Sequence, residues 1–172
     1  MKRFIFNLIL IILAFVVQNS VFPYLTFLSA VPNLLLILTF SFGFIRGKKA
    51  GMFYGALAGL ILDLFYTGPI GFYMLIFIWI GYLNGICNKY YYEEYITLPL
   101  VLSVANELAY SMYIYIFSFL LKNRLDFGYY VMNIMVPEII CTVVATLLFY
   151  RLFLLFNRQL ERLGQRRGTR IV

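Results

Sequence analysis

The side chains most able to take part in chemistry are three carboxylic acids inside long apolar stretches: Asp63, Glu107 and Glu138. A carboxylate at bilayer depth costs about 2.5–3.5 kcal/mol on insertion scales, so each should face protein or a wet cavity. The chain has no histidine, which removes imidazole bases, His metal ligands and Ser/His or Cys/His nucleophile pairs. Acid-only catalysis is formally left, but no metal-ligand spacing such as ExxH accompanies the acids. We therefore expect a protein that is not an enzyme and holds no metal or cofactor.

Asp63 also ends a ridge of small residues spaced four apart, which consists of Gly47, Gly51, Gly55 and Gly59. In lipid such a ridge lets a second helix approach to backbone contact. Steps of four residues drift by about 40° each, so the ridge sweeps about 160° of the helix, and only a right-handed crossing would follow all of it. A local patch beside Asp63, made of Gly55, Ala58, Gly59 and Leu62, is the better-defined contact surface. The spacing leaves open whether the second helix belongs to this chain or to another protein.

The intramembrane polar residues lie at similar depths on different stretches. At about 1.5 Å per residue, Asp63 falls in the outer third of its span, Glu138 follows Pro137 in the outer half, and Glu107 lies near mid-span. Asn33, together with Gln18 and Asn19, lies near the outer surface. We predict a polar cluster in the outer half of the protein. For Asn33, Gln18 and Asn19 we expect hydrogen bonds that satisfy groups between helices, for Asp63 a functional role, and for Glu107 and Glu138 both interpretations stay open.

Composition identifies an integral membrane protein. Of the 172 residues, 63% are hydrophobic and only 12% are charged, and the mean hydropathy is +0.89, so polar residues could not cover the surface of a soluble domain. Most of the apolar stretches approach the ~20 residues that cross ~30 Å of hydrocarbon, the second being short. The sequence predicts an all-α bundle of six transmembrane spans: Phe4–Phe22, Val31–Ile45, Ala50–Tyr66, Ile70–Cys87, Ile96–Leu121 and Tyr130–Phe156.

The 14 Lys and Arg residues predict the orientation of these spans. If both termini are cytoplasmic, only Lys122 and Arg124 lie outside, as the positive-inside rule requires. The excess positive charge then orients the protein and meets anionic headgroups, so no nucleic-acid partner is expected. We interpret the basic, apolar start of the chain as a retained first helix and not as a cleaved leader. The chain divides into a transmembrane domain, residues 1–157, and a basic cytoplasmic tail, residues 158–172.

Other residues have structural interpretations. Aromatic residues that bracket the turns, among them the YYY run at 90–92, are typical of rings at the headgroup level. Cys87 and Cys141 lie near or inside the bilayer, where we expect apolar packing and no disulfide.

The order of several short motifs resembles the MreD family of bacterial rod shape-determining membrane proteins. These are Gln18–Asn19 at the end of the first span, PNLLLIL at 32–38, RGKKAG at 46–51, GALAGLILDLFYTGPIGFYML at 55–75 and GYLNG at 81–85. The resemblance covers about the first ninety residues, and the second half resembles the family in length, hydropathy and basic tail.

The resemblance implies a non-enzymatic subunit of the cell-elongation machinery in the bacterial inner membrane, concerned with cell shape and cell wall biogenesis. Its expected direct partner is MreC, and MreB, RodA and a penicillin-binding transpeptidase would join through the complex. On this basis we expect a groove bordered by Gly55, Gly59 and Asp63 to bind the transmembrane segment of MreC, and Gly51 to extend the same surface.

The family is also similar in fold to the substrate-binding subunits of energy-coupling-factor vitamin transporters, which have six helices and a ligand pocket in the outer half. Such a subunit is the alternative function. Those subunits typically carry an AxxxA motif in the first helix, whereas this chain has only Ala14 there, which weakens the transporter interpretation.

Overall fold

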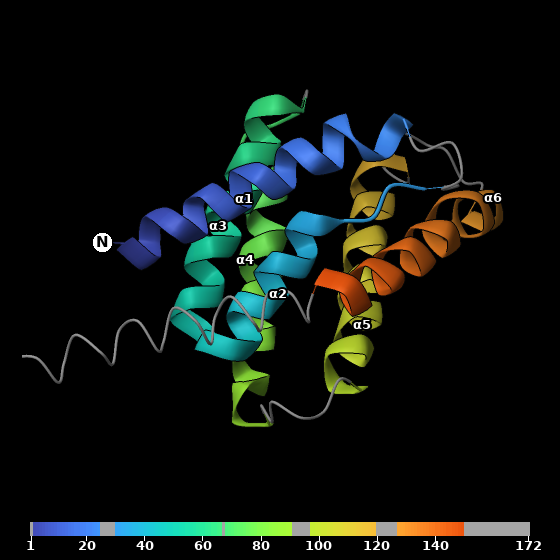
Figure 1. Ribbon diagram of the computed structural model, residues 1–172. Helices are drawn as coiled ribbons and strands as arrows, with labels where there is room; N and C mark the ends of the chain where they lie inside the picture. Colours follow the sequence, from blue (N-terminus) through green and yellow to red (C-terminus); the bar gives the residue numbers. More distant parts are fainter. Residues whose placement is uncertain (1, 25–29, 67, 91–96, 120–126, 150–172) are drawn as a thin grey trace, which may run out of the picture.

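The computed structural model describes residues 2–24, 30–66, 68–90, 97–119 and 127–149. In these ranges the chain forms six α-helices (Figure 1): α1 Lys2–Ser20, α2 Leu34–Arg46, α3 Lys48–Phe65, α4 Phe72–Ile86, α5 Thr97–Ile114 and α6, which begins as Phe127–Tyr130 and stays helical to Phe149. Short 3₁₀ turns follow α1 at Phe22–Tyr24 and α4 at Cys87–Tyr90. The all-helical prediction is confirmed, and all six predicted spans contain a helix.

The core of the fold is α2, which contacts α1, α3, α4 and α5. Every residue from Leu34 to Phe44 is buried. A helix that is apolar on all sides is stable only when neighbours surround it, and LLLILTFSFGF has no polar face to turn outward. Three of the large aromatic side chains of the core therefore come from this one helix, Phe40, Phe42 and Phe44, and Phe77 of α4 is buried beside them.

Helices α3 and α4 form an antiparallel hairpin whose backbones touch, and the two ribbons run side by side in Figure 1. The glycine ridge of α3 makes this contact. A methyl group at Gly51 would overlap the carbonyl oxygen of Gly81, one at Gly55 would meet the carbonyl of Phe77, and one at Gly59 would overlap the backbone of Met74. The helix that the glycine ridge accommodates is thus α4 of the same chain.

The three remaining helices surround this core. By length and composition, α1, α5 and α6 are the three described helices that can cross a membrane, and between 17% and 28% of their most apolar windows is buried. Their exposed side chains are large and apolar, for example Leu13, Val101 and Leu148. Because lipid can solvate such side chains, a low degree of burial is compatible with stable helices in a bilayer.

The second span is short, as expected, whereas the fourth is shorter than the predicted Ile70–Cys87. Helix α2 has 13 residues and α4 has 15, so at 1.5 Å per residue they measure about 20 Å and 23 Å, less than the ~30 Å of hydrocarbon. The physical reason lies in the helix ends: Pro32–Asn33 precedes α2, and Gly47, with φ +86°, separates α2 from α3. The last predicted span continues beyond Phe149, outside the described residues.

Close backbone contact between α3 and α4 leads to a first prediction. Gly51→Ala should lower the free energy of unfolding by about 1–3 kcal/mol, because its methyl group must displace the backbone of Gly81. The measurement is thermal unfolding of the detergent-solubilised protein, followed by the fluorescence of Trp79. The matched control is Gly68→Ala, since nothing lies within 4 Å of a methyl group there; its effect should stay within about 0.5 kcal/mol. Equal effects of the two variants would contradict the contact.

Candidate functional site

Asp63 caps the start of α4. Its carboxylate accepts hydrogen bonds from the backbone N–H groups of Gly71 at 2.9 Å, Tyr73 at 2.8 Å and Met74 at 3.1 Å, and the residue is 6% exposed. The first N–H groups of a helix have no partner within it. Gly71, the residue before α4, has no side chain that could supply one. The carboxylate therefore satisfies these donors and also lies at the positive end of the α4 dipole.

This arrangement changes the expected role of the surface around Asp63. The expected groove for MreC, bordered by Gly55, Gly59 and Asp63, is filled by α4 of the same chain. The physical reason is that a tight turn after Phe65 returns the chain directly onto the ridge, where small residues allow the closest approach. All three residues are buried in the α3–α4 hairpin, so a partner helix cannot reach them without separating the two helices.

A second set of polar residues joins α2, α5 and α6 on the other side of the core. Glu107 is 0% exposed, and the polar residues that face its carboxyl group are Glu138, Thr142 and Asn33. The backbone N–H of Asn33 donates to the Thr142 hydroxyl oxygen at 3.1 Å, while the Asn33 side chain accepts from the N–H of Leu36 and caps α2. The structure thus brings Asn33, Glu107 and Glu138 together, but places Asp63 in the α3–α4 hairpin.

Glu107 is unusual among these residues. Neither of its carboxyl oxygens makes a well-aligned hydrogen bond with the described residues, although the side chains of Thr142 and Asn33 lie within interaction range. A buried polar group without partners is costly, so this carboxyl group does not stabilise the fold in the way that Asp63 does. It is the strongest candidate in the described chain for a side chain retained for a reason other than stability.

Two predicted polar residues of α1 have structural roles. The Gln18 side-chain oxygen accepts from the N–H of Leu35 at 3.2 Å, and Asn19 accepts from the Tyr66 hydroxyl at 2.6 Å. These bonds confirm the expectation that Gln18 and Asn19 satisfy groups between helices.

Sequence reasoning missed several buried polar links between helices. Asn7 of α1 donates to the Tyr54 hydroxyl of α3 at 2.7 Å, and the side-chain amides of Asn84 and Asn106 exchange two hydrogen bonds at 2.7 and 3.0 Å between α4 and α5. The hydroxyl groups of Ser103 and Thr146 lie 2.9 Å apart and join α5 to α6. The sequence feature that could have identified these links is the presence of amide and hydroxyl side chains inside apolar stretches.

Two of the three outer helices also have a π-helical turn. One, Tyr115–Phe119, follows directly after α5, and the other, Val131–Met135, interrupts α6. Pro137 explains the second turn, because it has no N–H to donate to the preceding turn of α6. The two distorted segments meet through the rings of Tyr115 and Tyr130, whose centroids are 5.1 Å apart. The Tyr130 hydroxyl donates to the carbonyl oxygen of Ser111 at 3.0 Å, which ties α6 to α5.

No group of three or more potential metal-ligating side chains occurs among the described residues, and Cys87 and Cys141 are free. Buried glycines, a capped hairpin and three helices long and apolar enough to cross a membrane are typical of a membrane protein.

Comparison with known proteins places this membrane protein in a family. Residues 1–160 match the family model described as rod shape-determining protein MreD. The chain is also 30% identical over 130 residues to the "Rod shape-determining protein MreD" of Bacillus subtilis (strain 168), an alignment that covers 75% of this chain and 74% of that relative. The chain therefore belongs to the MreD family, and the resemblance seen in the first ninety residues extends through the second half. No solved structure matches.

The cap on α4 yields a second prediction. Asp63→Leu should lower the free energy of unfolding by on the order of 3 kcal/mol, because three partly buried N–H groups lose their acceptor. Asp63→Asn keeps one side-chain oxygen, so it should cost less, about 1 kcal/mol. Thermal unfolding in detergent ranks the two variants. A Leu variant as stable as the wild type would contradict the capping role.

The buried carboxyl group of α5 yields the opposite prediction. Glu107→Met, which has a similar length, should leave the stability unchanged or raise it by about 1–2 kcal/mol, because the carboxyl group is fully buried and makes no well-aligned hydrogen bond with the described residues. The neighbouring Thr142→Val should lower the stability by about 1 kcal/mol, since it removes the acceptor of the Asn33 N–H. Thermal unfolding in detergent tests both variants. A strongly destabilised Glu107→Met would show that the carboxyl group accepts a hydrogen bond that stabilises the fold.

Proposed function

We propose that this chain is a non-enzymatic, multi-pass subunit of the cell-elongation machinery in the bacterial cytoplasmic membrane. Membership of the MreD family carries the proposal. In it the chain holds MreC directly and supports the peptidoglycan synthases, RodA and a penicillin-binding transpeptidase, together with MreB, through the assembled complex. Its contribution is geometric, since the acids of the described helices bind helix ends or face one another and do not form a catalytic set.

The distribution of basic residues supports cytoplasmic termini. Lys48 and Lys49 begin α3, Arg46 ends α2, and Lys89 follows α4. These helix ends lie together, because the Asn88 side chain donates to the carbonyl oxygens of Phe44 and Ile45 at the end of α2. Helix α1 begins at the same end, where Asn7 bonds Tyr54. A bundle with one basic end is oriented with that end toward the cytoplasm.

In this proposal the partner binds the outer helices and not the glycine ridge. Gly51, Gly55, Gly59 and Asp63 act indirectly, because they hold the α3–α4 hairpin around which the other helices are arranged. The surfaces open to a partner's transmembrane helix are the exposed apolar faces of α1, α5 and α6.

The alternative, a substrate-binding subunit of an energy-coupling-factor transporter, has no support from the comparisons. The matched family and the B. subtilis relative are both described as rod shape-determining, and no solved structure matches. The likeness in fold to those subunits therefore remains an expectation.

The proposal is tested by affinity purification of the tagged protein from its native membrane in mild detergent, for the wild type and Asp63→Leu. We expect the wild type to recover MreC and other wall-elongation proteins. Asp63→Leu should lower the amount of folded protein and of MreC in the same proportion, because Asp63 acts through the fold.

The other outcomes separate the parts of the proposal. A several-fold loss of MreC per folded chain in Asp63→Leu would mean that Asp63 contacts the partner, against the structural role given to it. Failure of the wild type to recover any wall-elongation protein would overturn the scaffold function. Recovery of an ATPase module with a membrane coupling subunit would instead support the transporter.

A further inference from the structure

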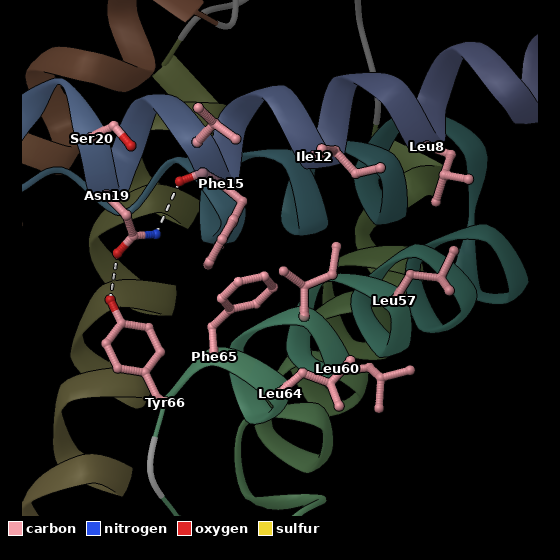
Figure 2. Close-up of a pocket in the computed structure, with 12 residues that line it drawn as sticks. Leu8, Ile12, Phe15, Asn19, Ser20, Leu57, Leu60, Leu64, Phe65 and Tyr66 are labelled. Atoms are coloured by element: carbon pink, nitrogen blue, oxygen red, sulfur yellow. Dashed lines mark hydrogen bonds between the residues drawn. The ribbon is translucent and has the colours of Figure 1, made fainter.

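We infer that the groove between α1 and α3 binds one acyl chain of an outer-leaflet phospholipid, with a zwitterionic, ammonium-bearing headgroup at the end marked by Asn19, Ser20 and Tyr66. The groove has a volume of about 820 Å³ (Figure 2). It is independent of the polar cluster and of the α3–α4 contact. The inference requires only that the protein lies in a bilayer.

The walls of the groove are apolar and come from two helices that run in the same direction. Leu8 of α1 lies at the same end as Leu57 of α3, and Asn19 lies at the same end as Tyr66 (Figure 2). The other lining side chains are Ile12, Phe15, Val16, Leu60, Ile61, Leu64 and Phe65. Water does not occupy a space lined in this way, so in a membrane it is filled by hydrocarbon or by protein.

Contacts at both ends keep the two helices at a fixed separation. Toward the basic end, the rings of Phe4 and Phe53 lie 5.9 Å apart, and the Asn7–Tyr54 hydrogen bond lies one turn further along. Toward the other end, the rings of Phe15 and Phe65 lie 4.8 Å apart beside the Asn19–Tyr66 hydrogen bond. The groove is therefore built into the fold and is not a gap between loosely placed helices.

The dimensions of the groove fit an acyl chain. On α1 the lining extends from Leu8 to Ser20, about 18 Å along the helix at 1.5 Å per residue. One leaflet of a bilayer is about 15 Å of hydrocarbon. The groove thus reaches from the end of α1 to the bilayer midplane, which is the depth of one lipid chain.

The shape of the walls favours lipid over a second helix. Helices that associate in membranes use small residues to bring their backbones close. In this protein the small residues of α3 face α4, whereas the groove is lined by Leu, Ile and Phe, with Ser20 as its one small residue. A flexible chain can follow such a surface, but a rigid helix would be kept at a distance by the large side chains.

The side chains at the mouth favour a headgroup that carries an ammonium. They are polar and uncharged, namely Asn19, Ser20 and Tyr66, and their oxygen atoms can accept hydrogen bonds from an ammonium. The described Lys and Arg residues all lie at the opposite end of the bundle. The net negative charge of phosphatidylglycerol therefore has no cationic partner at this mouth, whereas the ammonium of phosphatidylethanolamine has acceptors there.

The test is native mass spectrometry of the detergent-solubilised protein, supplied with phosphatidylethanolamine and phosphatidylglycerol of identical acyl chains. We expect the wild type to retain one phosphatidylethanolamine at least threefold more than phosphatidylglycerol. Leu60→Trp, which fills the groove, should reduce this retention at least threefold. The matched control, Leu83→Trp, alters an exposed leucine of α4 and should leave retention unchanged, and thermal unfolding confirms that both variants fold.

Several results would overturn the inference. Equal retention of phosphatidylethanolamine by Leu60→Trp and Leu83→Trp would mean that the retained lipid is annular lipid and does not occupy the groove. Preference for phosphatidylglycerol would place the headgroup at the basic end. A mass of two protein chains without lipid, lost in Leu60→Trp, would mean that a second copy occupies the groove.

Discussion

The backbone contact between α3 and α4 is the constraint on which the rest of the structure depends. It exists because Gly51, Gly55 and Gly59 face Gly81, Phe77 and Met74, with no side chain between the two helices. The same approach places Asp63 within hydrogen-bond reach of the first N–H groups of α4. It also provides the surface on which α2 packs, since Gly43 of α2 lies against Gly81. A side chain at any of these glycines would separate the hairpin and remove the support of the central helix.

A second constraint comes from the membrane. Where no water is available, helix ends inside the protein need partners supplied by side chains. Asn33 and Gln18 bond the first N–H groups of α2, Asn88 bonds its last carbonyl groups, and Asp63 bonds the start of α4. Asn33 is the cap of its own helix, but Gln18, Asn88 and Asp63 come from other elements, so each short core helix depends on its neighbours for its ends. The longer helices α1, α5 and α6 expose large apolar side chains, as expected of helices that face lipid.

These constraints are consistent with the role of a family that determines rod shape. The described acids bind helix ends or face one another inside the bundle, and the exposed surface is largely apolar. Glu107 is the exception, because its burial opposes stability and its carboxyl oxygens make no well-aligned hydrogen bond with the described residues.

The sequence by itself determined the class of protein, the six helices, the basic end and the family, because hydropathy, charge distribution and motif order are local properties of the chain. It also identified the glycine ridge as a contact surface. The tertiary structure alone decided which helix fills that ridge and which N–H groups Asp63 binds, and it joined Asn33, Glu107 and Glu138 but not Asp63. The reason is that a periodic pattern specifies a face of a helix, whereas the identity of the facing helix depends on the turns that connect them. The sequence also indicated that the second span is short, but it did not indicate that α4 begins only after Gly71, because a hydropathy window averages away the effect of Pro and Gly residues at a helix end.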